Sequence, residues 1–267
     1  MSYALRLSEN EHARYRMMAR RALEREADLW RLAGITAGAC VADVGCGPGA
    51  LLAVLADVVG SDGEVVGVDA DPDAVRTARA SLLEATGRDA DVRLARADDT
   101  GLAAGTFDVA VLRHVLAHNS LTDQQRIVAH LAGLVRPGGC VYLLDVDASS
   151  SSITPSLPET EDLHARYQQW HARRGNDLRT GRRLALLARD AGLDVVEFRG
   201  WFEMFTVPVG MRGPAWAAVD ALVADGLAER DDLERWEAAF THLDARPERP
   251  QGMIATFAAV CRRPQQQ

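Results

Sequence analysis

The segment from Cys40 to Gly49, CVADVGCGPG, limits the possible folds of this chain more than any other part of it. Val41, Ala42 and Val44 are small or β-branched, as a buried parallel strand requires. Glycines follow at positions 45, 47 and 49, and an apolar helical run begins at Ala50. A strand that turns through glycines into a helix brings backbone N–H groups close to a ligand at the helix N-terminus. The segment therefore predicts a ligand-binding turn in an α/β protein.

The glycine turn does not identify its ligand alone. With Ala50 in the last position it also fits the Gly-x-Gly-x-x-Gly/Ala pattern of dinucleotide-binding proteins. A second apolar strand, Glu64–Val68, is followed by Asp69, and a carboxylate at that place can accept hydrogen bonds from ribose hydroxyls. The turn and Asp69 together predict a cofactor that contains a ribose.

Strands and helices alternate over the middle of the chain. After Asp69 the patterns predict a helix that runs to about residue 86, strands over 92–95, 107–112 and 140–145, and a helix over 122–134. Alternation this regular implies right-handed crossovers and a parallel sheet with helices on both faces.

The alternation breaks after Asp147. The serine-rich stretch 148–158 has no apolar periodicity and is expected to be a loop. Helical patterns cover 159–173, 179–191, 216–224 and 231–243, with strands expected over 195–207 and 252–261. Before the glycine turn, apolar residues from Tyr15 to Trp30 recur at helical spacing. That N-terminal helix is interpreted either as a packing element or as a lid over the ligand.

Composition excludes several classes of protein. The chain has 267 residues, 48% of them hydrophobic, which is enough for a sizeable core in one large or two small domains. The net charge of −8 and the absence of a long basic run argue against a nucleic-acid partner. The sequence contains no 18-residue apolar window and no signal-peptide pattern, and its four cysteines lack metal-ligand spacing. We therefore expect a cytoplasmic protein with free thiols and no membrane partner.

Four motifs, taken in order, resemble the class I S-adenosylmethionine-dependent methyltransferases. They are Val41–Gly49, Val66–Asp69, Ala97–Asp99 before the strand Phe107–Val111, and Leu134–Gly139. The most similar branch is the quinone-biosynthesis-like group of small-molecule enzymes. The resemblance spans roughly residues 37 to 147.

The resemblance implies a fold and a division of the chain. The fold is α/β, a Rossmann-like seven-stranded, mostly parallel sheet with helices on both faces. Its strand order is 3-2-1-4-5-7-6 with strand 7 antiparallel, and an N-terminal helix and a helical insertion are added to it. Residues 1–34 form the N-terminal helical lid, and residues 35–267 form the methyltransferase domain with helical insertions near 159–191 and 208–251.

The resemblance also assigns cofactor contacts. Asp43 engages the methionine part of S-adenosylmethionine, where a carboxylate beside an ammonium group is favourable. Asp69 binds the ribose, and Asp98 accepts from the adenine amine, with Asp99 as the alternative. The residues assigned to the cofactor or its product S-adenosylhomocysteine are Asp43, Gly45, Cys46, Gly47, Gly49, Asp69, Ala70, Asp98, Asp99, Arg113 and His114.

Methyl transfer from a sulfonium needs orientation and, for some acceptors, a base. His118 is the candidate base. It lies four residues after His114, a spacing that also suits a metal pair, but no third ligand is evident and no metal is expected. Aromatic residues outside the motifs suggest an apolar or planar acceptor. The candidate acceptor residues are Tyr15, Asn119, Asp147, Tyr167, Trp170, Trp201 and Met204.

The predicted function is methyl transfer to a small, apolar or aromatic metabolite of secondary-metabolite or quinone-like type. One alternative is an enzyme that binds S-adenosylmethionine without transferring methyl. Another is a nicotinamide-dependent oxidoreductase, which the turn Arg136–Gly139 and the Asp98 motif disfavour. A monomer and a homodimer are both compatible with the sequence.

Overall fold

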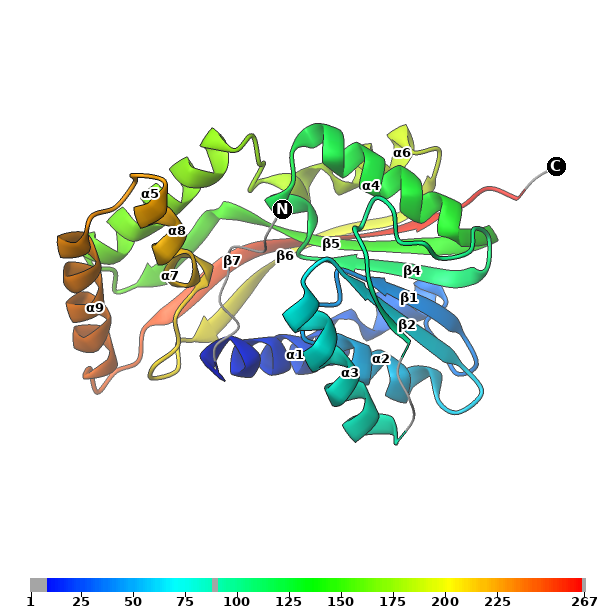
Figure 1. Ribbon diagram of the computed structural model, residues 1–267, viewed down its shortest axis with the longest axis horizontal. Coiled ribbons are helices and arrows are strands. Elements are labelled where there is room, and N and C mark those ends of the chain that lie inside the picture. The colour runs from blue at the N-terminus through cyan, green and yellow to red at the C-terminus, as the bar shows by residue number, and fades with distance from the viewer. Residues whose placement is uncertain (1–8, 88–90, 266–267) are drawn as a thin grey trace.

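A computed structural model describes residues 9–87 and 91–265, with side chains from residue 15 onward. Its seven strands form one sheet in the order β3-β2-β1-β4-β5-β7-β6, as predicted (Figure 1). The strands are β1 Cys40–Val44, β2 Glu64–Asp69, β3 Val92–Leu94, β4 Phe107–Arg113, β5 Val135–Thr154, β6 Asp194–Thr206 and β7 Gln251–Arg262. The helices are α1 Glu9–Ala33, α2 Ala50–Val59, α3 Pro72–Thr86, α4 Leu121–Leu134, α5 Pro158–Arg173, α6 Leu184–Asp190, α7 Pro214–Ala217, α8 Val219–Ala224 and α9 Arg230–Asp244, with 3₁₀ turns η1 Leu116–His118 and η2 Thr180–Arg183.

The register of the sheet brings three ligand-binding segments together. β1 pairs in parallel with both β2 and β4, so that Asp43 lies opposite Gly67 on one side and Val111 on the other. The carboxyl ends of β1, β2 and β4 therefore meet at one edge of the sheet, where ligands bind in open α/β folds. β7 runs antiparallel to both β5 and β6, as expected.

Helices lie on both faces of the sheet (Figure 1), and a hydrophobic core lies beneath them on each face. On one face, Trp30 of α1 and Leu55 of α2 pack against strand residues that include Val41 and Tyr142. On the other face, Leu131 of α4 and Leu187 of α6 pack against a second set of strand residues. All four cysteines are free thiols, and three of them are buried. Burial of apolar side chains on both faces explains the continuous apolar character of the parallel strands.

β5 is longer than the sequence indicates. The stretch 148–154, expected to be a loop, continues β5 and pairs with β7 through Ser152, Ile153 and Thr154 after a bulge. Within the bulge the backbone N–H of Ala255 donates to the Ser150 hydroxyl at 2.7 Å, so a side chain replaces a bond of the strand ladder. The predicted turn at 136–139 likewise lies at an irregularity where β4 pairs with β5.

A helical cap is carried at the end of the long strands β5, β6 and β7 (Figure 1). Helices α5, α7, α8 and α9 share a core of their own, built on side chains such as Trp170, Leu222 and Trp236. The predicted insertion at 159–191 is thus divided, because α5 belongs to the cap whereas α6 covers the sheet. Residues 1–8 of the predicted N-terminal lid lie outside the described residues.

We expect the substitution Trp236→Ala to lower the free energy of unfolding by about 3–5 kcal/mol, because it removes a large side chain from the cap core. Trp236 is fully buried, and its indole donates to Asp162 at 3.0 Å. Denaturant unfolding followed by circular dichroism measures the change. Phe202→Ala is the control, because Phe202 is 61% exposed and its truncation should change stability by no more than about 0.5 kcal/mol. Equal effects of the two substitutions would contradict the separate cap core.

Candidate active site

The glycine turn lies directly against the loop after β4. The N–H groups of Gly45 and Cys46 donate to the carbonyl of Val68 at 2.7 and 3.0 Å, which joins the turn to the end of β2. Gly45 has φ +75°, and a Cβ added there would lie 2.3 Å from Cγ2 of Val115. Only glycine fits this position, because any side chain would meet both the backbone strain and the valine.

Asp69 at the end of β2 is hydrogen-bonded to the turn. Its Oδ2 accepts from the N–H of Gly47 at 2.8 Å, and its Oδ1 accepts from the N–H of Asp71 at 2.9 Å. Burial raises the pKa of Asp69, while these two backbone donors lower it. The carboxylate is thereby fixed at the edge where β1 and β2 meet.

Asp43 is buried at the end of β1 with one oxygen unsatisfied. The residue is 2% exposed, and within the described part of the chain its Oδ2 has no hydrogen-bond partner. Burial raises the pKa of Asp43 to about 7, against the opposing effect of the Arg113 guanidinium. A buried, unpaired carboxylate oxygen at the wall of a cavity is suited to accept a hydrogen bond from a cationic ligand group.

A buried network connects α1 to this edge of the sheet. The carboxylate of Glu26 accepts from Arg113 at 2.6 Å, from the hydroxyl of Tyr142 at 2.8 Å and from the indole of Trp30 at 3.3 Å. Burial lowers the pKa of Arg113, but the Glu26 carboxylate raises it, and the net result is a raised pKa. Glu26 therefore holds the guanidinium at the end of β4, beside Asp43.

The residue after Arg113 has an unusual backbone. His114 has φ +58° and is the one non-glycine residue with a positive φ among residues 9–87 and 91–265. Its N–H donates to the carbonyl of Leu144 at 2.9 Å, which ties the β4 end to β5. Such conformations are uncommon for residues with a Cβ and cluster at functional sites.

These groups line one large cavity of about 1590 Å³, which extends from the glycine turn to the cap. One end holds Asp43, Gly45, Asp69 and Arg113, and the other is walled by aromatic side chains of the cap. The aromatic residues that line it are Tyr15, Tyr167, Trp170, Phe205, Trp216 and Phe240.

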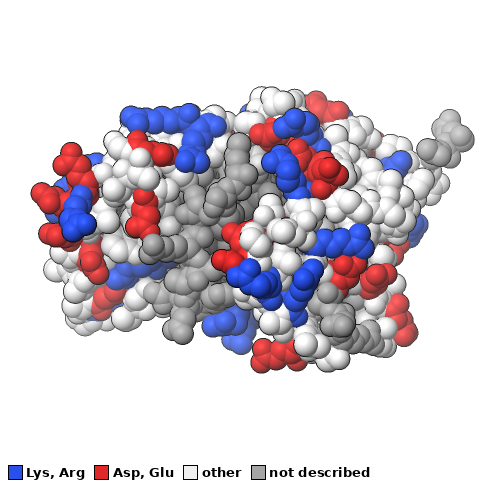
Figure 2. Space-filling model, viewed as in Figure 1, with Lys and Arg blue, Asp and Glu red and all other residues white. Residues whose placement is uncertain are grey.

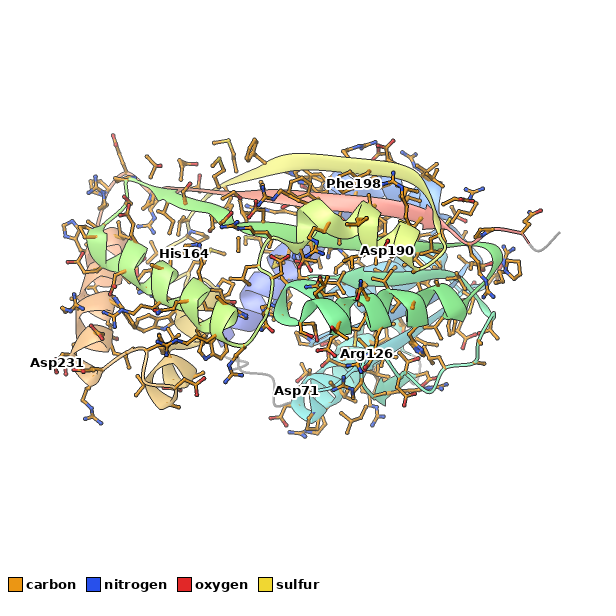
Figure 3. The ribbon with its side chains drawn as sticks, turned by 90° about the horizontal axis from the view of Figure 1, so that it is seen from above. Asp71, Arg126, His164, Asp190, Phe198 and Asp231 are labelled. Atoms are coloured by element: carbon orange, nitrogen blue, oxygen red, sulfur yellow. The ribbon has the colours of Figure 1, made fainter. Side chains whose placement is uncertain are left out.

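Figure 3 shows α5, marked by His164, beside the cap helix that carries Asp231. On the face seen in Figure 2, acidic and basic side chains are interspersed.

The structure brings most of the predicted cofactor residues to this cavity. The predicted residues that line it are Asp43, Gly45, Cys46, Gly47, Asp69, Ala70, Asp98, Arg113, His114, His118, Tyr15, Asn119, Tyr167 and Trp170. Gly49 is not among the lining residues and instead permits close packing, since a Cβ there would lie 2.7 Å from Cα of Ala78 in α3. Asp99 also lies outside, in a turn where its N–H donates to the carbonyl of Arg96. Of the two adjacent aspartates, Asp98 is the one at the cavity, and Arg96 donates to its two oxygens at 2.8 and 3.0 Å.

Three predicted acceptor residues lie elsewhere. Asp147 forms an ion pair with Arg182 at 3.0 Å and accepts from the N–H of Ser149, and it is not among the residues that line the cavity. Trp201 donates to Glu203 at 3.1 Å and packs beside the α1 core, and Met204 is 59% exposed on β6. Strand alternation explains Met204, because its neighbours Glu203 and Phe205 line the cavity and it faces the opposite side of the sheet. Trp201 is on the same side as Glu203 but lies two residues farther along β6, against the α1 core.

Other residues at the cavity were not predicted. Glu26 of α1 and His164 and His171 of α5 all line it, and each lies outside the motifs. Their only sequence signal is a polar residue within an amphipathic helix, which is indistinguishable from an exposed position. Within the described ranges, no three His, Cys, Asp or Glu side chains are grouped as a metal site, and no helix is long and apolar enough to cross a membrane.

The burial of Asp43 predicts a pH dependence of stability. Its pKa is about 7 when folded and near 3.8 when unfolded, so the folded state binds more protons between these values. The free energy of unfolding of the wild type, relative to Asp43→Asn, should therefore fall as the pH rises from about 4 to 7 and level off above. Urea unfolding at several pH values measures the difference. A difference that grows as the pH rises would contradict a buried, neutralised Asp43.

The chain is similar to known methyltransferases. A family model for the methyltransferase domain matches residues 10–198. The ubiquinone biosynthesis O-methyltransferase of Thiobacillus denitrificans is 32% identical over 165 residues, which cover 61% of this chain and 68% of that protein. The nocamycin O-methyltransferase of Saccharothrix syringae is 37% identical over 106 residues, 40% of this chain and 37% of that protein.

Solved structures share the fold. The YcgJ protein from Bacillus subtilis has a TM-score of 0.58 at 15% identity, covering 90% of this chain and 98% of that chain. The [4+2]-cyclase SpnF has a TM-score of 0.53 at 14% identity, covering 94% of this chain and 82% of that chain.

The cavity suits the cofactor that this family uses. Asp43 offers an unpaired carboxylate oxygen, and Asp69 offers a fixed carboxylate at the end of β2. With the family model matching most of the chain and the strand order confirmed, the chain belongs to the S-adenosylmethionine-dependent methyltransferases.

Proposed function

We propose that this protein transfers a methyl group to a planar, apolar small molecule that binds between the glycine turn and the cap. The observation that carries the proposal is the continuity of the cavity, which has polar groups at the turn and aromatic walls at the cap. Small-molecule sites combine apolar and aromatic walls with a few placed polar groups. The names of the ubiquinone and nocamycin O-methyltransferases support an acceptor of this type.

We assign the polar end of the cavity to the cofactor. Asp43 accepts from the amino group of the methionine part, with Arg113 close by to bind its carboxylate. Asp69 accepts from the ribose hydroxyls, Ala70 lies beside the adenine, and Asp98 accepts from the adenine amine while it stays paired with Arg96. The N–H groups of the turn and the β4 end around His114 complete this part of the site.

S-adenosylmethionine, when bound, supplies a methyl group activated by the positive charge of its sulfonium. The chain contributes binding, orientation and exclusion of water. His118, at the end of η1, lines the cavity three residues after Val115, which packs against Gly45 of the turn. In this proposal His118 accepts the proton that the acceptor loses.

Two alternatives to the proposal are a nicotinamide-dependent oxidoreductase and an enzyme that binds the cofactor without transferring methyl. The match to the methyltransferase family removes the support for a nicotinamide-dependent oxidoreductase. The fold alone does not exclude an enzyme that binds the cofactor without transferring its methyl group, because a protein whose structure is named a [4+2]-cyclase has the same architecture. Detection of a methylated product separates that alternative from the proposal.

Cofactor binding tests the assignment of the polar end. S-adenosylmethionine and S-adenosylhomocysteine should both bind in calorimetric titrations, and NADH should not. Asp69→Asn should weaken both by about 10- to 100-fold, because hydrogen bonds to a charged acceptor are lost. The exposed Asp73→Asn is the matched control and should leave binding unchanged. Unchanged binding by Asp69→Asn would contradict the ribose assignment.

His118→Asn tests the proposed base. We expect the rate of methyl transfer to a panel of phenols and quinols to fall by about 100-fold or more, because general-base assistance is lost. Binding of S-adenosylhomocysteine should persist. Mass spectrometry with methyl-labelled cofactor measures the product directly. An unchanged rate in this variant would exclude His118 as the base.

A further inference from the structure

His171 is a buried histidine at the cavity to which the motifs assign no role. It lies near the end of α5, is 2% exposed and lines the cavity. Its Nε2 atom has no hydrogen-bond partner among the described residues. Buried polar atoms in native proteins are nearly always paired, so an unpaired one calls for an explanation such as a ligand.

Asn176 determines which ring nitrogen of His171 carries the proton. The side-chain nitrogen of Asn176 lies 3.0 Å from Nδ1 of His171. An amide nitrogen only donates, so Nδ1 is the acceptor and the neutral ring carries its proton on Nε2. Burial lowers the pKa of His171 to about 3, helped by His118 and Arg174, so the ring is neutral near pH 7.

The position of Asn176 is itself fixed. Its backbone N–H donates to the carbonyl of His171 at 3.0 Å, and its backbone pairs with Ser120 just after η1. The orientation of the His171 ring is therefore set by the junction between α5 and the segment that follows β4.

Aromatic rings pack around the imidazole ring of His171. The Tyr167 ring meets it edge to face with centroids 4.6 Å apart, and the Trp170 ring does so at 4.8 Å. The His118 ring is tilted at 5.2 Å. All three neighbours line the cavity. The imidazole of His171 thus lies in a largely aromatic part of the cavity wall, and its Nε2 atom has no partner among the described residues.

A series of contacts connects His171 to the glycine turn. Val115 packs against Gly45 of the cofactor turn, and η1 leads from Val115 to His118. The ring of His118 in turn neighbours His171. A planar acceptor placed against His118 would therefore present a second atom to His171.

We propose that His171 donates its Nε2–H to an oxygen of the acceptor, a carbonyl or ionised hydroxyl on a planar body, and so orients the acceptor for methyl transfer. This inference rests on the proposed function, and it narrows the acceptor to oxygenated planar molecules. A ring without such an oxygen would leave the donor unpaired, so His171 discriminates against it.

The test uses two ligands that differ by one oxygen. The planar ketone 9-fluorenone and the hydrocarbon fluorene have the same three-ring body. Their binding to the full-length protein with saturating S-adenosylhomocysteine is measured by equilibrium dialysis. The wild type should bind the ketone about tenfold or more tightly than the hydrocarbon, because only the ketone pairs the buried donor.

Variants on one helix supply the controls. His171→Phe keeps a flat ring without a donor and should bind both ligands equally. His171→Gln restores an N–H near Nε2 and should recover most of the preference. Gln169→Ala, two residues earlier on α5, should leave the preference intact, because Gln169 is exposed and is not among the residues that line the cavity.

The outcomes distinguish this inference from the proposed function. Calorimetry first confirms that each variant binds S-adenosylhomocysteine, and failure of the wild type to bind it would count against the function itself. A preference for the ketone that survives in His171→Phe would overturn the role of His171. So would a wild type without preference, or one that binds neither ligand. If His171→Phe does not fold, Asn176→Ala is measured instead and should lose part of the preference.

Discussion

A buried ion pair between Glu26 of α1 and Arg113 of β4 joins the N-terminal helix to the functional edge of the sheet. The two side chains are only 4% and 9% exposed, and Tyr142 and Trp30 share the same carboxylate. Such a pair adds little net stability, because desolvation offsets the attraction, but losing one partner leaves a buried charge. Its role is positional, since it fixes Arg113 beside Asp43 and α1 against the cavity.

The ion pair also bears on whether α1 is a lid or a packing element. From Ala19 to Trp30 the helix contributes buried residues to a sheet core, and Leu29 and Trp30 are at most 2% exposed. Opening this half of α1 would separate Glu26 from Arg113 in an apolar environment. We therefore infer that this half of α1 is a wall of the site, on which Ala22 and Glu26 line the cavity.

The long strands β5, β6 and β7 connect two parts of the molecule, the parallel part of the sheet and the helical cap. The parallel part of the sheet presents the glycine turn and the acidic ends of β1 and β2, which depend on local backbone geometry. The extensions beyond it carry a cap with its own core, separate from the cores that pack on the sheet. In the proposed function the cap contacts the acceptor and the parallel part of the sheet contacts the cofactor, an arrangement by which one fold can support many reactions.

Sequence reasoning succeeded where the signal is local. Glycine spacing, apolar strands and the acidic ends of β1 and β2 are properties of short segments. They established the resemblance to a family, and the strand order that the resemblance implied is the one observed. The prediction of a loop was wrong at Ser149–Ser152, which continue β5. There the Ser150 hydroxyl accepts the hydrogen bond of a strand N–H, and the apolar alternation typical of a strand is absent. The sequence also does not show which face of β6 meets the cavity or how far along the strand the cavity extends, so Met204, on the opposite face, and Trp201, farther along the strand, lie outside it. His171 was missed because its role depends on Asn176 and on a loop distant in sequence.

The most direct test of the account is a crystal structure of the protein with S-adenosylhomocysteine. The account predicts the ligand's amino group within hydrogen-bond distance of Asp43, its ribose on Asp69, and its sulfur directed toward His118 and His171 beneath the cap. A ligand bound outside this cavity, or one reversed so that its sulfur points away from the cap, would contradict the account.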